Sequence, residues 1–144
     1  MHHLRILTLA LFCTITVPAQ AQDKRVKVEL PSMMQTHMLA NMRDHLLALQ
    51  TITHLLATRQ YEEAADTAER RLGMSSLESH GASHMGPFMP AEMRAIGTNM
   101  HRAASRFAIS ARDAAIDGGL EKSFAALSEV MEHCVACHSG YKVH

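Results

Sequence analysis

The chain has 144 residues, which is enough for one domain and short of two. Lys and Arg together number 14, as do Asp and Glu, so the formal net charge is zero and no strong field favours binding to nucleic acid or to an anionic membrane. Trp is absent, whereas Met and His each number 11. Both of these residue types bind soft or borderline metal ions, although Met also fills helical cores.

The first 21 residues have the features of an export signal. A short positive start at residues 1–5 precedes an apolar run at residues 6–17, which is too short to span a bilayer. Ala-Gln-Ala at residues 19–21 is a cleavage motif. We therefore expect a periplasmic mature domain of residues 22–144 with no stable membrane anchor, and we expect Cys13 to be removed with the signal.

Helical periodicity dominates the first half of the mature chain. Residues 32–57 are predicted to form a helix, which Ser32 and Gln35 would open as a capping box. A second helix is predicted from Tyr61 to a stop at Gly73, after a turn near residues 58–60, because one helix over residues 32–72 would be about 60 Å long. The inward stripe of the first helix is Met38, Met42, His45, Leu49, Ile52 and Leu56.

The second half contains one long connection and two more predicted helices. Residues 74–89 are rich in Ser, Gly and Pro and cannot form a continuous helix. Pro90 at the first helical position predicts a helix to about Ile116, followed by a last helix from about Leu120. No strand pattern is found, so the predicted fold is an all-α, antiparallel four-helix bundle. Steps of four and three residues in the last helix predict a buried face formed by Leu120, Phe124, Leu127, Met131, Cys134, His138 and Tyr141.

The last helix ends in Cys134-Val135-Ala136-Cys137-His138, the Cys-x-x-Cys-His attachment sequence of c-type haem. The two thiols can form thioethers with one porphyrin, and His138 then becomes the proximal ligand of the iron. A disulfide or a zinc site is an alternative in an oxidising compartment. A thioredoxin-like site needs a strand before the motif and a helix after it. We expect one haem c, held covalently by Cys134 and Cys137.

These features together resemble the class II cytochromes c, the cytochrome c′ group and its low-spin relatives. The resemblance lies in the four helices, the terminal haem motif with Tyr141 and Lys142 after it, and the pair Ala64-Ala65. It implies a haem near the end of the last helix, a distal residue from the first helix, and a possible homodimer through the first two helices. The His- and Met-rich connection departs from the family pattern.

The resemblance also implies which residue faces the iron opposite His138. Met42 matches the family's distal position best, counted back from the alanine pair, with Met38 and His45 as alternatives. His/Met ligation implies a periplasmic carrier of one electron between exported redox proteins, rather than an enzyme. The alternative is a five-coordinate or displaceable-ligand protein that binds NO or CO. Weak peroxidase chemistry would need a distal acid–base group, for which His45 is the candidate.

Two further groups of histidines remain. His80, His84, Met85 and Met89 in the connection could bind copper, but we expect this segment to fold over the end of the bundle, with Phe88 and Met89 packed into it. The other histidines show no convergent spacing and are expected at the surface: His37, His54, His101, His133 and His144.

Overall fold

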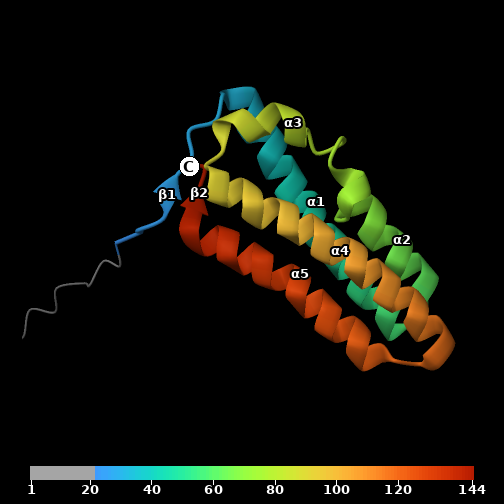
Figure 1. The fold of residues 1–144 in the computed structure, drawn as a ribbon. Helices are drawn as coiled ribbons and strands as arrows, with labels where there is room; N and C mark the ends of the chain where they lie inside the picture. Colours follow the sequence, from blue (N-terminus) through green and yellow to red (C-terminus); the bar gives the residue numbers. More distant parts are fainter. Residues whose placement is uncertain (1–21) are drawn as a thin grey trace, which may run out of the picture.

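The computed structural model describes residues 22–144, and the expected export signal lies outside this range. Four long helices form most of the described chain: α1 (Ser32–Ala57), α2 (Tyr61–Arg71), α4 (Ala91–Asp117) and α5 (Leu120–Gly140). They lie lengthwise beside one another (Figure 1). The prediction of long packed helices is confirmed in a mostly helical structure, and the helix ends fall within one or two residues of those expected.

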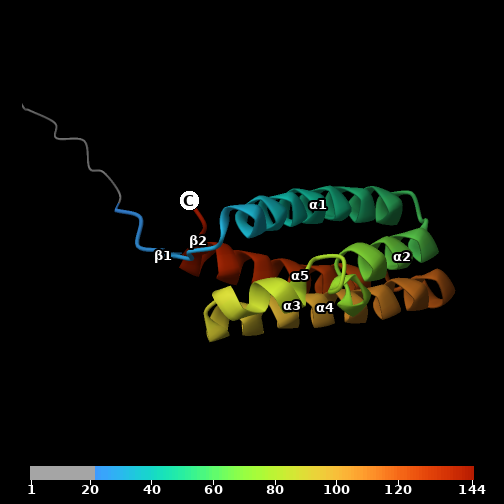
Figure 2. The ribbon, with the colours of Figure 1, turned by 90° about the horizontal axis from the view of Figure 1, so that it is seen from above.

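The four helices do not pack equally closely. The backbone of α4 lies against α5 on one side and against α2 on the other, and α1 lies against α2 but barely approaches α5. Figure 2 shows α1 on one side of the molecule, with α4 and α5 on the other. Small side chains allow the close approach of α4 and α5, and the Ser123 hydroxyl donates to the Ser110 carbonyl at 3.1 Å. Space is therefore left between α1 and α5.

The turns between helices follow from local backbone chemistry. A turn at residues 58–60 separates α1 from α2, as predicted, with Arg59 in the left-handed region at φ 60°. Gly118, at φ 74°, caps α4 in the left-handed conformation that glycine adopts without strain. Pro90 is the cap that precedes α4 rather than its first residue.

The predicted capping box at the start of α1 is wrong. Pro31 caps the helix, Ser32 is its first residue, and no side chain bonds to the exposed backbone amides of the first turn. Gln35 instead donates its side-chain amide to the Val143 carbonyl at the other end of the chain. A tertiary partner has therefore replaced the local one.

Two short strands connect the ends of the described chain, which the prediction of a purely helical fold missed. Val26–Lys27 (β1) pairs in parallel with Tyr141–Lys142 (β2), and the Val28 amide donates to the Lys142 carbonyl at 2.8 Å. Two residues are too few to show the alternation that indicates a strand. Val28 is buried, so its side chain anchors the N-terminal segment beside the end of α5.

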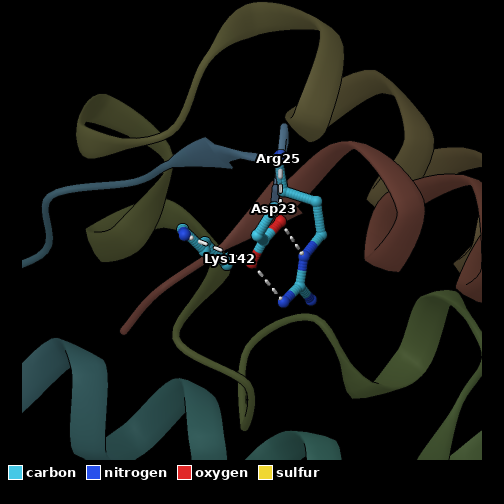
Figure 3. A network of polar contacts seen from close by, with 3 residues as sticks. All are labelled: Asp23, Arg25 and Lys142. Carbon is cyan, nitrogen blue, oxygen red and sulfur yellow. Dashed lines mark hydrogen bonds and ion pairs between the residues drawn. The ribbon is translucent and has the colours of Figure 1, made fainter. Parts of the chain in front are cut away.

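A polar network reinforces this pairing (Figure 3). The Asp23 carboxylate accepts hydrogen bonds from the guanidinium of Arg25 and from Lys142 Nζ, at 3.2 Å for the latter. The bonds from Arg25, and then that from Lys142, hold the pKa of Asp23 well below its usual range. These groups are exposed, so the network contributes little stability by itself, and it orients the segment that Val28 anchors.

The connection between α2 and α4 contains only short pieces of helix, as expected: η1 (Met74–Ser76), α3 (Ala82–Met85) and η2 (Gly86–Phe88). Met85 is buried and Met89 packs against the same end of the molecule. Phe88 was expected to pack inward, but 43% of its surface is exposed. Among the helices of residues 22–144, none combines the length and the hydropathy that a membrane-spanning helix needs.

Candidate functional site

A cavity of about 420 Å³ opens between α1, α4, α5 and the connection that leads into α4. This volume lies in the range that small-molecule and cofactor sites occupy. Methionines from three parts of the chain form much of its apolar wall: Met38, Met42, Met85, Met89, Met93 and Met100. The cavity lies where α1 stands apart from α5, so the unequal packing of the helices creates it.

The predicted haem motif opens on this cavity. Cys134, Cys137 and His138 all line it, from the last two turns of α5. Both thiols are free and partly buried, and burial raises the pKa of each above its usual value. A reactive dithiol usually lies at a helix N-terminus, where the dipole favours the thiolate. Here the motif lies at the C-terminal end of α5, so no helix dipole favours the thiolates, and the thiols stay protonated at pH 7 in the absence of a metal.

The predicted buried face of α5 is only partly correct. Leu127 is buried, but Phe124 and Met131 are 45% and 42% exposed, and His138 is exposed although it lines the cavity. The physical reason is the close packing of α5 on α4, which turns Ser123 and Val130 inward instead. The imidazole of His138 is accordingly at the open side of the cavity rather than within the packed core.

The candidate distal residues lie on the opposite wall, on α1. Met38 is buried, Met42 is half-buried and His45 is buried, and all three line the cavity. Met38 belongs to the apolar cluster at the end of the molecule where Cys137 lies, and Met42 packs against that cluster. The structure thus brings the motif of α5 and the candidate residues of α1 to the wall of one cavity.

Three histidines form a buried cluster in the wall of the same cavity. His45 comes from α1, His80 from the connection and His101 from α4, and their ring centroids are 4.7, 5.4 and 6.0 Å apart. Each side chain is more than nine-tenths buried. Burial, and then the charges of the other two histidines, lower the pKa of His45 to about 4. Burial also lowers the pKa values of His80 and His101, so all three rings are neutral at pH 7.

Hydrogen bonds fix the tautomer of two of these rings. The Leu72 carbonyl lies 2.7 Å from Nδ1 of His101 and can only accept, so this nitrogen carries the proton. Ser76 donates its hydroxyl hydrogen to the Gly73 carbonyl at 2.7 Å, and its oxygen then accepts from Nδ1 of His80 at 3.3 Å. Nε2 of both rings therefore bears a free lone pair. Nε2 of His45 is buried and has no hydrogen-bond partner.

The sequence did not predict this cluster. His101 was expected at the surface and is instead buried, because its ring faces the end of α2, where Nδ1 donates to the Leu72 carbonyl. His80 was considered only with His84, which is exposed. One available signal was the spacing of Met93, Gly97 and His101, which are four residues apart on one helix face. His133, also expected at the surface, lines the cavity, whereas His37, His54 and His144 are exposed, as expected.

The residues of the cavity suit a haem. The motif supplies two thiols and an imidazole, and the facing wall supplies thioether and imidazole ligands. Gly97 on α4 lines the cavity, and a Cβ atom at this position would meet nothing within 4 Å. A residue without a side chain thus leaves that wall flat and open. Arg94 also lines the cavity, and none of the ion pairs in residues 22–144 includes it, so it is available to a carboxylate.

Comparisons with protein-family models, with curated proteins and with solved structures find no match to this chain.

Proposed function

We propose that this protein is an exported mono-haem cytochrome c that carries one electron between other exported redox proteins. The observation that carries the proposal is that Cys134, Cys137, His138 and Met42 line one cavity. They reach it from α5 and from α1, the two long helices whose backbones barely approach each other. The long packed helices support the further proposal of a four-helix bundle of the class II cytochrome c type.

Each residue of the proposed site has a defined role. Cys134 and Cys137 would hold the porphyrin through thioethers, and their protonated, partly buried thiols favour this role over a redox dithiol. His138 and Met42 would be the axial ligands, with Met38 and His45 as alternatives. A haem held in this way supplies a ferric–ferrous couple, whose potential the thioether and the apolar wall raise. Arg94, which lines the cavity, would pair with a propionate carboxylate of the haem.

The remaining wall would shield the site. Buried Met85 and Met93 exclude water from the side of the connection and of α4, and a lowered local dielectric favours the less charged form of the iron site. The N-terminal segment, held by Val28 against Lys142, fixes the chain that follows His138. A stable ligand set with little reorganisation suits electron transfer.

The proposal is tested by measuring whether the protein carries a covalently bound haem. The mature protein, made with a c-type maturation system, should keep its haem through denaturation and acid–organic extraction. Loss of the haem on extraction, or its absence, would contradict the proposal and leave a disulfide or a haem-free helical protein. The matched variant Cys134→Ser, Cys137→Ser should have no covalent haem, while Ser139→Ala, in the same turn of α5, should keep it.

The spectrum then separates the two candidate functions. A low-spin ferric protein with a weak near-infrared sulfur-to-iron band and slow or absent CO binding supports the electron carrier. A high-spin protein that binds CO or NO rapidly supports the gas-binding alternative. A low-spin spectrum without the sulfur band would show that the sixth ligand is His45 or another histidine rather than Met42.

A further inference from the structure

The ring nitrogens of the His45–His80–His101 cluster are potential metal ligands. Nε2 of His80 and of His101 carries a lone pair, because Nδ1 of each ring is committed as a hydrogen-bond donor. Nε2 of His45 is buried without a partner, which is a costly arrangement for a polar atom. The three rings come from three separate segments and meet at the wall of one cavity. Neutral imidazoles in this state are ready ligands for a cation.

The kind of cation follows from what surrounds the cluster. In residues 22–144, no three His, Cys, Asp or Glu side chains by themselves form a group that could hold a metal ion. A site here must therefore use other donors, and the cavity wall offers thioether sulfurs from Met38, Met85 and Met100, each of which is buried. Thioether and imidazole together select Cu(I) over the harder divalent ions.

The absence of charge on the proposed ligands also favours Cu(I). Imidazoles and thioethers are neutral, so the bound metal keeps its full charge in a largely apolar cavity. The nearest carboxylate in sequence, Asp44, is already held by the guanidinium of Arg71. A single positive charge costs far less to bury than two, which favours the cuprous ion over copper(II) or zinc.

We propose that the cavity contains a second metal site, in which a cuprous ion binds between the imidazoles of the His45–His80–His101 cluster and the thioether sulfurs of buried methionines. The bond lengths are compatible: with metal–nitrogen distances near 2.0–2.1 Å, imidazoles on one tetrahedral ion have ring centroids about 5 Å apart. The observed separations of 4.7, 5.4 and 6.0 Å bracket this value.

Binding here displaces no proton, because the rings are already neutral and the thioethers have none. The site uses neither Cys134 nor Cys137, so it leaves the covalent attachment of the haem unaffected, and it requires that Met42 rather than His45 or Met38 binds the haem iron. The proposed site differs from the copper site considered within residues 74–89. His80 would bind the ion together with two histidines from helices, and the exposed His84 would take no part.

The experiment uses the purified mature protein with its haem. Anaerobic titration with Cu(I) against a chromophoric Cu(I) chelator gives stoichiometry and affinity, and X-ray absorption at the copper edge identifies the donor atoms. We expect one Cu(I) per chain, with both nitrogen and sulfur scatterers. His80→Gln should weaken binding by at least about 10-fold, as the loss of a ligand or its support does. The matched control, His84→Gln, should bind as the wild type does.

Methionine variants keep the test decisive if His80→Gln is poorly folded. A change of Met to Leu conserves side-chain volume, so the fold survives while the sulfur is lost. Met38→Leu or Met85→Leu should weaken Cu(I) binding, and Met33→Leu, at a position 82% exposed on α1, should not. Absence of Cu(I) binding, equal affinity in all variants, or a shell of nitrogen alone would each overturn the proposal. Because the readout is copper, loss of the haem would contradict the cytochrome assignment without affecting this result.

Discussion

The imidazole ring of His45 on α1 lies 4.7 Å from that of His80, centroid to centroid, although the whole of α2 separates the two residues in the sequence. Asn41, one turn before His45, donates its side-chain amide to the His80 carbonyl at 3.0 Å and so fixes the connection against α1. This contact closes one side of the cavity that α5 borders with the Cys-x-x-Cys-His motif. The cavity thus depends on a segment with little regular structure.

The lowered pKa values of the cluster predict that stability falls in mild acid. The pKa of His45 is about 4 in the folded protein and about 6.5 in the unfolded chain. Between pH 6.5 and pH 4, His45 is therefore protonated in the unfolded chain but not in the folded protein, and this favours unfolding. His45 alone should remove up to about 3 kcal/mol of the free energy of unfolding between pH 6.5 and pH 4. Chemical denaturation at a series of pH values, with a copper chelator present, measures this loss.

The control for this pH dependence is His45→Gln, which cannot be protonated. Its free energy of unfolding should fall less steeply between pH 6.5 and pH 4 than that of the wild type. His54→Gln, at an exposed position of the same helix, should keep the wild-type slope. Equal slopes in all three proteins would show that His45 does not titrate with a lowered pKa.

Gly97 tests whether the flat wall of α4 is needed for haem. Gly97→Ala should be accepted, because a Cβ atom meets nothing within 4 Å, and should stabilise α4 by about 0.5–1 kcal/mol. Gly97→Leu should project a side chain into the cavity and lower the fraction of chains that carry covalent haem. The ratio of haem absorbance to protein measures this fraction. Full haem content in Gly97→Leu would show that the haem does not approach this wall.

The sixth ligand can be tested on α1. Met42→Ala should abolish the near-infrared sulfur band and open the iron to CO, because the proposed sulfur ligand is removed. Met38→Ala should leave the band largely intact, although it truncates a buried side chain on the same helix. Loss of the band in Met38→Ala alone would assign the ligand to Met38 instead.

The N-terminal segment should contribute to stability through Val28. This residue is 3% exposed, so Val28→Ala removes buried methyl groups and should lower the free energy of unfolding by about 1–3 kcal/mol. Val26→Ala, in the adjacent strand and 55% exposed, should change it by less than about 0.5 kcal/mol. Urea denaturation of the two variants measures the difference, and equal effects would mean that the segment does not anchor the C-terminal end.

The sequence by itself determined the helices and the proposed attachment site. Helical spacing on α1, Pro90 before α4 and the two glycines after it are local signals, and local chemistry decides where helices begin and end. The spacing of Cys134, Cys137 and His138 is likewise a property of one helical segment. Met38, Met42 and His45 from the inward stripe of α1 line the cavity on which this segment opens.

Only the tertiary structure decided how the helix faces are used and which histidines meet. The packing of α5 on α4 left His138 exposed and Phe124 partly exposed, because small residues let the two backbones approach closely. The capping box at Ser32 was lost because Gln35 found a partner across the molecule. The cluster of His45, His80 and His101 draws on three segments, and no periodicity within one segment can report a contact between segments. Its proximity to the haem motif is a consequence of the space that α1 leaves beside α5.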